Sequence, residues 1–110
     1  MTSAGSFAAP NGLTVGLSQL NPLVGDLSGN EAKILADYAK AEVAGCHVVV
    51  YPELTITGYP PEDLLLKKAF VRDNELAVER SAKATRECVA LVGFEKADGE
   101  YIYNAVALCR

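Results

Sequence analysis

Glu53 is the residue whose type and position best suit it to do chemistry. It comes just after a short apolar run, residues 47–51 (HVVVY), and a loop with Gly58 and two adjacent prolines follows it. Apolar runs of this kind are typical of strands in the middle of a sheet. Loops after such strands commonly carry catalytic groups, so Glu53 is a candidate general base. The alternative is a carboxylate that caps the loop or simply meets water.

The sequence offers no nucleophile within reach of Glu53. Its single histidine, His47, starts the strand that Glu53 follows, which separates the two by on the order of 20 Å at about 3.3 Å per residue. The three cysteines, Cys46, Cys88 and Cys109, are expected at the opposite, amino edge of the sheet. Proton transfer requires a distance of about 3 Å. We therefore interpret the cysteines as small buried hydrophobes.

Neither a disulfide framework nor a metal site is favoured. An odd number of cysteines without a CxxC pair favours a reducing cytosol. A two-residue turn at 98–99 would set Cys88 opposite Cys109, close enough for a disulfide bridge if the geometry suits. We nevertheless expect reduced thiols. The Cys46-His47 pair lacks the spacing of zinc ligands, and neither GxxxxGK[ST] nor GxGxxG is present. We expect no metal and no cofactor in this chain.

Two strands and a helix lead to Glu53. Residues 13–20 alternate apolar with smaller or polar side chains and predict a strand, residues 31–44 predict an amphipathic helix, and residues 47–51 predict the second strand. A strand–helix–strand unit implies parallel pairing with a right-handed crossover. Groups that bind ligands in such sheets gather beyond the carboxyl ends of the strands, which is where Glu53 lies.

The helix at 31–44 has recognisable ends and faces. Ser28 or Asn30 could cap its start, and Gly45 sits where a glycine stop is expected. The apolar face of this helix consists of Ile34, Leu35, Tyr38 and Ala41. The outer face consists of Lys33, Asp37 and Lys40.

The second half of the chain adds two helices and a hairpin. Pro61 and the two acidic residues after it predict a short helix that ends near residue 70, followed by a helix over 72–87. Residues 89–95 predict a strand, and the turn pair at 98–99 returns the chain as an antiparallel strand over 101–109. The order β-α-β-α-α-β-β indicates the α/β class.

Length and composition indicate one globular domain. Residues 1–12 are small and polar, without a basic residue ahead of an apolar run, and predict a flexible lead-in to a domain at 13–110. The net charge of −4 argues against a nucleic-acid surface. The apolar runs are too short to span a membrane, so we expect a cytoplasmic protein without a membrane partner.

Several stretches around Glu53 resemble the nitrilase-type carbon–nitrogen hydrolases. LSQLNPLVGDLSGN and AGCHVVVYPELTITGY look like the opening of such a domain. GYPPEDLL and the later Tyr103-Asn104-Ala105 are similar to one branch, the amino-terminal glutaminase domains of glutamine-dependent NAD⁺ synthetases. The resemblance runs from about Leu13 to the last residue. It implies a layered αββα sandwich, of which this chain supplies roughly the first half.

The resemblance implies a role for Glu53 in a Glu–Lys–Cys triad. Glu53 would be the general base that takes the proton of a cysteine thiol, whose sulfur attacks the side-chain amide of glutamine and releases ammonia. A thiol with a pKa near 8.5 needs such help to react efficiently at pH 7. The family lysine and cysteine lie beyond Arg110, and Lys67, Lys68 and Lys96 stand in other motif contexts. The chain therefore looks like an amino-terminal fragment and is expected to be inactive alone.

Two further positions carry weaker expectations from the same resemblance. Tyr59, after Gly58, could line the glutamine pocket; a turn glycine followed by a packing tyrosine is the alternative. Tyr103 and Asn104 could support the wall of the active site, or be a strand tyrosine and a polar edge residue.

The implied parent enzyme would be a homo-oligomer. It would use ATP and Mg²⁺ in a separate synthetase domain, where ammonia converts deamido-NAD to NAD⁺. Without that remainder, one apolar face of the sheet is expected to lack a partner. The alternatives are another nitrilase-type amidase, or a non-catalytic interaction module that keeps the half-fold.

Overall fold

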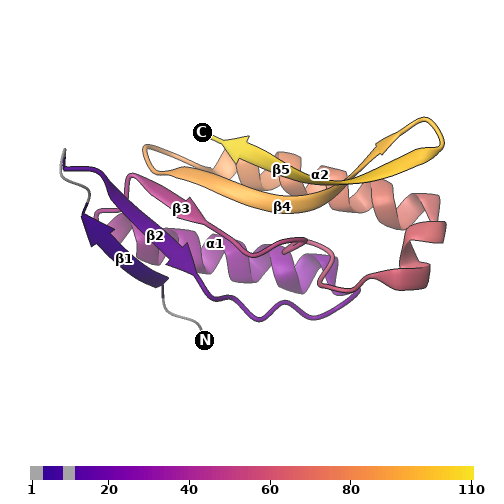
Figure 1. The fold of residues 1–110 in the computed structure, drawn as a ribbon, viewed down its shortest axis with the longest axis horizontal. Coiled ribbons are helices and arrows are strands. Elements are labelled where there is room, and N and C mark those ends of the chain that lie inside the picture. Colours follow the sequence, from indigo (N-terminus) through magenta and orange to yellow (C-terminus); the bar gives the residue numbers. More distant parts are fainter. Residues whose placement is uncertain (1–3, 9–11) are drawn as a thin grey trace.

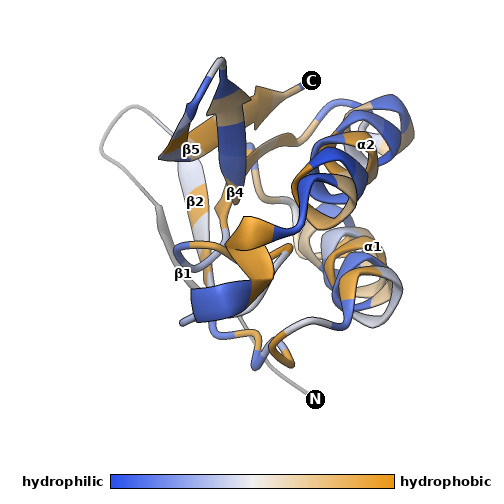
Figure 2. Ribbon diagram, turned by 90° about the vertical axis from the view of Figure 1, so that its right-hand side faces the viewer, coloured by the Kyte–Doolittle hydropathy of each residue, from blue (hydrophilic) through white to orange (hydrophobic). Residues whose placement is uncertain are grey.

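In the computed structural model, which describes residues 4–8 and 12–110, the chain forms a five-stranded sheet with two helices on one of its faces (Figures 1 and 2). The strands are β1 (Ala4–Ala8), β2 (Thr14–Ser18), β3 (Val48–Val50), β4 (Val89–Asp98) and β5 (Tyr101–Cys109). The helices are α1 (Leu27–Val43), the short 3₁₀ helix η1 (Glu62–Leu66) and α2 (Lys68–Ala84). None of the helices among the described residues is long and apolar enough to cross a membrane.

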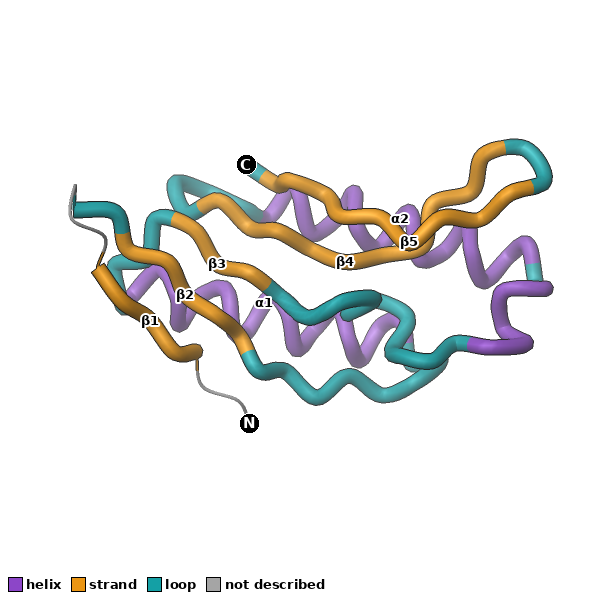
Figure 3. Tube along the Cα trace, in the orientation of Figure 1, coloured by secondary structure: helices purple, strands orange, loops and turns teal. Residues whose placement is uncertain are grey.

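The three central strands are parallel, as the sequence predicts. The strands lie in sequence order, with β2 and β4 parallel to β3, and β1 and β5 antiparallel at the two edges. The carboxyl ends of β2, β3 and β4 therefore meet at one edge of the sheet, from which two long loops extend (Figure 3). The expected α/β class and the parallel strand–helix–strand unit are confirmed.

Part of the expected lead-in is a strand. β1 pairs with β2 in an antiparallel register that sets Ala4 opposite Ser18 and Ala8 opposite Thr14. The prediction of a flexible lead-in over 1–12 therefore does not hold for Ala4–Ala8; residues 1–3 and 9–11 lie outside the described residues. Side-chain patterns gave no signal here because an edge strand can be added through backbone hydrogen bonds alone.

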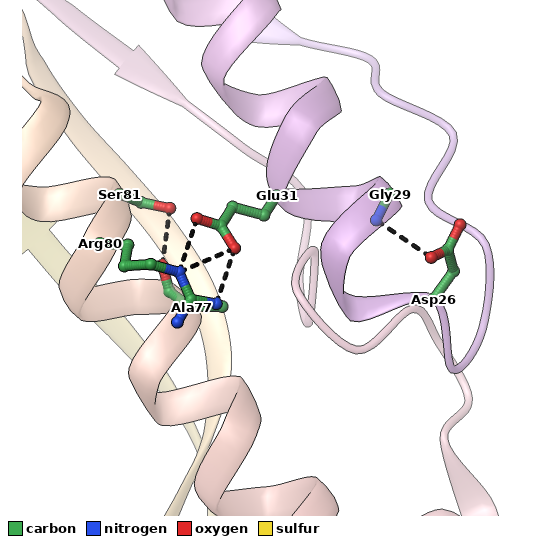
Figure 4. A network of polar contacts seen from close by, with 6 residues as sticks. All are labelled: Asp26, Gly29, Glu31, Ala77, Arg80 and Ser81. Carbon is green, nitrogen blue, oxygen red and sulfur yellow. Dashed lines mark hydrogen bonds and ion pairs between the residues drawn. The ribbon is translucent and has the colours of Figure 1, made fainter.

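α1 begins earlier than expected and has a different cap. Asp26 is the N-cap residue, and its Oδ1 accepts a hydrogen bond from the Gly29 N–H at 3.0 Å (Figure 4). Neither Ser28 nor Asn30 caps the helix. The expected stop at Gly45 is confirmed, since this residue has φ +81°. The N–H groups of Gly45 and Cys46 close the helix end on the carbonyls three and five residues back, a Schellman motif.

The outer face of α1 contains one buried residue that the helical pattern did not predict. Asp37 is 3% exposed, although the sequence places it with Lys33 and Lys40. It lies beside Tyr51, which donates a hydrogen bond to the Ile34 carbonyl at 3.3 Å. Burial first, and then the nearby Asp37 carboxylate, raise the pKa of Tyr51. A polar contact between α1 and the residue after β3 thus replaces the expected solvated carboxylate.

The segment after Pro61 divides differently from the prediction. The short helix is the 3₁₀ turn η1, and the long helix α2 starts four residues before the expected residue 72 and ends at Ala84. α2 packs on α1, where the Arg80 guanidinium binds the Glu31 carboxylate with a closest N–O distance of 2.8 Å (Figure 4). Ser81 is buried at this side of α2 and donates to the Ala77 carbonyl at 2.9 Å.

The β4–β5 hairpin has a different register from the one that the sequence suggests. Asp98 pairs with Tyr101, so the two turn residues are Gly99 and Glu100 rather than 98–99. This moves the partner of Cys109 from Cys88 to Ala90. The expected alignment of the two cysteines is wrong, and all three thiols of the chain are free and buried.

The helices cover one face of the sheet and leave the other open (Figure 2). The covered face packs a core in which Ile34, Val49 and Val92 are almost fully buried. On the other face Leu17, Val106 and Leu108 are 49%, 68% and 63% exposed. The expected unpartnered apolar face is therefore present.

Candidate functional site

Glu53 lies at the carboxyl edge of the sheet, as predicted. It stands three residues after β3, and the Tyr51 N–H donates to the Leu91 carbonyl at 3.0 Å, which continues the pairing with β4 up to the loop. The Glu53 side chain is exposed and has neither a hydrogen bond nor an ion pair with the other described residues. Its carboxylate is thus available to a group that approaches the open face.

A neighbouring loop holds the Glu53 loop in place. The fully buried Asn30 side chain donates to the carbonyls of Leu23 (2.8 Å) and Ile56 (2.9 Å), and its Oδ1 accepts from the Leu23 N–H at 2.8 Å. The Gly25 N–H also donates to the Thr57 carbonyl at 2.9 Å. These bonds join the loop after β2 to the loop after β3, which run side by side in Figure 3. Asn30 therefore fixes a loop rather than capping a helix.

Gly93 allows the Glu53 loop to cross β4 at close range. A Cβ atom at Gly93 would lie 2.6 Å from the Leu54 nitrogen and 2.9 Å from the Pro52 carbonyl oxygen. The Gly93 carbonyl also accepts a hydrogen bond from the Ile56 N–H at 3.3 Å. Because both close atoms belong to the backbone, a side chain at this position would push the Glu53 loop away from the sheet.

A hollow of about 310 Å³ lies beside Glu53 on the open face of the sheet. Three strands and the loop line it: Val50, Tyr51, Pro52, Glu53, Leu91, Gly93, Asn104 and Val106. The walls are mainly apolar, with one carboxylate and one amide. This is the composition expected of a small-molecule site that holds its ligand through few polar groups. Asn104 lines this hollow and Tyr103 does not; a place for either residue in the wall of an active site stays a prediction.

A second carboxyl group, Glu95, lies near this hollow. It is 4% exposed, and β4 directs it to the same face as Gly93, two residues earlier. Burial, and then the negative charge of Glu53, raise the pKa of Glu95. Glu95 belongs to no recognisable motif, and its only signal in the sequence is a carboxylate that directly follows the apolar residues 89–94.

The possible nucleophiles lie at the other edge, as predicted. Cys46 and Cys88 precede β3 and β4, and Cys109 pairs with Ala90 near the start of β4. Burial raises the pKa of Cys88 to about 11, which leaves little thiolate at neutral pH. His47 has a structural role there, because its Nδ1 accepts a hydrogen bond from the Thr14 N–H at 2.9 Å. None of these groups can serve Glu53.

The remaining candidates lie outside the hollow. Tyr59 is 65% exposed and does not line it, so its role as a substrate ligand stays a prediction. Lys96 is 3.9 Å from the Glu75 carboxylate. Within residues 4–8 and 12–110 there is no group of three or more side chains that could hold a metal ion. The described residues therefore supply a candidate base and a hollow, and not a complete catalytic set.

Comparison with known proteins identifies the family. The model of the carbon–nitrogen hydrolase family matches residues 14–110, which is nearly the whole chain. The chain belongs to the carbon–nitrogen hydrolase family. It is 42% identical over 100 residues to a glutamine-dependent NAD⁺ synthetase of Thermotoga maritima, a match that covers 89% of this chain and 17% of that protein.

Solved structures of this carbon–nitrogen hydrolase fold agree with the observed architecture. A glutamine-dependent NAD⁺ synthetase from Cytophaga hutchinsonii superposes with a TM-score of 0.76 at 26% identity, covering 98% of this chain and 17% of that one. An amidase from Nesterenkonia sp., at 20% identity and a TM-score of 0.74, shares the fold over 87% of this chain and 38% of its own. The chain thus spans about one sixth of the length of the synthetases it matches.

Proposed function

We propose that this chain is the amino-terminal part of the glutaminase domain of a glutamine-hydrolysing NAD⁺ synthetase, with Glu53 as the general base. The observation that carries the proposal is the exposed Glu53 carboxylate beside a hollow at the carboxyl edge, without a nucleophile among the described residues around it. The similarity to synthetases over most of this chain supports the choice of parent enzyme.

The proposed reaction uses Glu53 as a proton acceptor. A cysteine from the remainder of the enzyme gives its thiol proton to the Glu53 carboxylate, and its sulfur forms a bond with the amide carbon of glutamine. Glu53 returns this proton to the amide nitrogen, the carbon–nitrogen bond breaks with release of ammonia, and a thioester remains. Water then hydrolyses the thioester to glutamate and restores the thiol. A family lysine would hold the developing oxyanion.

The rest of the proposed parent enzyme would use the ammonia. ATP and Mg²⁺ would bind its synthetase domain, where deamido-NAD is amidated to NAD⁺; this chain would hold neither of them. We further propose that Tyr59 reaches glutamine only in the complete domain, because it is exposed here and lies apart from the hollow. The free cysteines fit a cytoplasmic enzyme, and a homo-oligomer remains our proposal for its assembly.

The test is glutamine hydrolysis by the protein encoded by the complete reading frame around these residues. Glu53→Gln should lower glutamine-dependent NAD⁺ formation at least about a hundredfold, the scale of general base catalysis, while formation from added ammonia persists. Glu62→Gln, at another exposed glutamate, is the matched control and should leave both activities unchanged. The 110-residue chain alone should release no ammonia. Normal glutamine use by Glu53→Gln would refute the proposed role.

Another amidase of the same fold is the second candidate function. The similarity to the Nesterenkonia amidase keeps it open, although that likeness concerns the fold alone. Ammonia release from glutamine without ATP-dependent formation of NAD⁺ by the complete protein would favour such an amidase. An absence of both activities would favour a non-catalytic interaction module.

A further inference from the structure

The turn that carries Glu53 sets one exposed residue against a run of buried ones. Within residues 53–58 Glu53 alone is exposed, and the five residues after it are buried. Leu54 and Thr55, which follow directly, are 4% and 0% exposed. The backbone must therefore turn sharply after Glu53, since this side chain faces solvent while the next two face the interior.

Leu54 makes this turn in an unusual backbone conformation. Its φ is +50°, in the left-handed region, which is unfavourable for a residue with a Cβ atom. Such a conformation persists only where the surrounding contacts hold it. The Leu54 carbonyl accepts a hydrogen bond from the Gly58 N–H at 2.8 Å, which holds the far side of the turn. The near side, at the peptide bond before Glu53, needs a contact of its own.

Thr55 supplies the contact on the near side. Its hydroxyl donates a hydrogen bond to the Pro52 carbonyl, which directly precedes Glu53. The same carbonyl faces β4, because a Cβ atom at Gly93 would lie 2.9 Å from its oxygen. Since Thr55 is fully buried, bulk water does not compete for this hydrogen bond. The bond therefore closes the turn around Glu53, from the residue before it to a buried residue after it.

A threonine hydroxyl can also bond a nearby carbonyl without any functional role. The end of α2 contains such a case, where the Thr85 hydroxyl donates to the Ala82 carbonyl, three residues earlier, at 2.7 Å. Local bonds of this kind are common for threonine in turns and at helix ends. The two threonines thus make the same type of bond, but only that of Thr55 has a candidate base between donor and acceptor.

We propose that Thr55 is a positioning residue for the reaction of Glu53: its hydroxyl ties the peptide bond before Glu53 to the buried part of the turn and so fixes the direction of the carboxylate. This inference rests on the proposed function, since it assumes that Glu53 is the base. A general base must lie within hydrogen-bond reach of the proton that it accepts. A small displacement of Glu53 therefore slows the chemical step more than it weakens the binding of glutamine.

The test compares two variants of the protein encoded by the complete reading frame. Thr55→Val removes the hydroxyl and keeps the shape of the side chain, whereas Thr55→Ser keeps the hydroxyl. Thr55→Val should lower kcat for glutamine hydrolysis roughly tenfold or more, with KM nearly unchanged. Thr55→Ser should retain most of the activity. Formation of NAD⁺ from added ammonia should persist in both variants, which checks that they are folded.

Thr85→Val is the matched control. It removes the equivalent hydrogen bond at the end of α2 and should leave kcat for glutamine unchanged. A similar loss of kcat in Thr55→Val and Thr85→Val would indicate general destabilisation and would overturn the inference. An equal loss in Thr55→Val and Thr55→Ser would overturn it as well, because the hydroxyl would then not be the group that matters.

The outcomes separate this inference from the proposed function. A normal kcat in Thr55→Val, together with an inactive Glu53→Gln, would refute the role of Thr55 and leave that of Glu53 standing. If the unaltered protein releases no ammonia, the proposed function fails, and hydrogen exchange then decides whether Thr55 holds the turn. The amides of residues 53–58 should exchange faster in Thr55→Val than in Thr85→Val, and equal rates would contradict the contact on which the inference depends.

Discussion

At the scale of single residues, burial decides which reactive groups of this chain are chemically available. Glu53 is exposed beside a hollow, whereas the three cysteines are buried in the core beneath the helices. Cys88 is 2% exposed, and the Tyr38 hydroxyl donates to its carbonyl at 2.6 Å. Cysteine, the residue type that supplies the nucleophile in the proposed reaction, is here part of the packing.

The buried thiol of Cys88 predicts a loss of stability at alkaline pH. Burial, followed by the charges of Cys46 and Glu42, raises its pKa from 9.0 to about 11. The unfolded chain therefore releases this proton at lower pH than the folded chain does. The protonated Cys88 thiol contributes fully to the free energy of unfolding below pH 9. This contribution, on the order of 2 kcal/mol, is lost as the pH rises toward 11.

Urea unfolding at several pH values tests this prediction. The free energy of unfolding should fall between pH 9 and pH 11 in the unaltered chain. Cys88→Ala should show a shallower fall over the same range, because only the unaltered chain has this proton to lose. If the free energy of unfolding fell equally with pH in the two proteins, Cys88 would not be the cause of the loss of stability at alkaline pH.

At the scale of elements, two loops are joined into one support for Glu53. The loop after β2 and the loop after β3 share the hydrogen bonds of Asn30 and the bond between the Gly25 N–H and the Thr57 carbonyl. Gly58 closes this contact, since a Cβ there would lie 2.6 Å from the Val24 Cα. The position of Glu53, the proposed base, therefore depends on Asn30 in the first turns of α1.

Replacement of Asn30 by alanine should destabilise the chain strongly. The change removes the partner of the part-buried Leu23 N–H and of the buried Ile56 carbonyl, which together costs roughly 2–4 kcal/mol. Asn21→Ala, at an exposed asparagine of the same loop, should change the free energy of unfolding by less than about 0.5 kcal/mol. Equal urea midpoints for Asn30→Ala and the unaltered chain would contradict the role given to Asn30.

At the scale of the whole molecule, the sheet is covered on one face only. The helices α1 and α2 lie on one side of the sheet (Figure 2). Leu17, Val106 and Leu108, on the opposite face, have exposed side chains. Large apolar side chains that gather on one face favour association, because contact removes them from water.

The 110-residue chain should therefore self-associate through this face. Sedimentation should show species larger than the monomer at micromolar concentration, and the double change Val106→Lys and Leu108→Lys should shift the population to monomer. Val43→Lys, at a position that is 90% exposed at the end of α1, is the control and should leave association unchanged. A monomer in the unaltered chain would refute the prediction.

The sequence alone determined the direction of the strands and the edge at which each reactive group lies. The apolar period and the strand–helix–strand order place Glu53 at the carboxyl edge and Cys46 and Cys88 at the amino edge, whatever the details of packing. These properties follow from chain direction and local pattern. For this reason the sequence already predicts that Glu53 lacks a nucleophile beside it, which holds for residues 4–8 and 12–110.

Only the tertiary structure decided the contacts between distant parts of the chain. Ser28 or Asn30 was expected to cap α1, but Asp26 is the N-cap residue, and the Asn30 side chain contacts Ile56, 26 residues away. The hairpin register, the crossing of the Glu53 loop over Gly93 and the place of Glu95 are of the same kind. Each depends on how separate elements pack against one another in the interior, and neither local propensity nor periodicity specifies that packing.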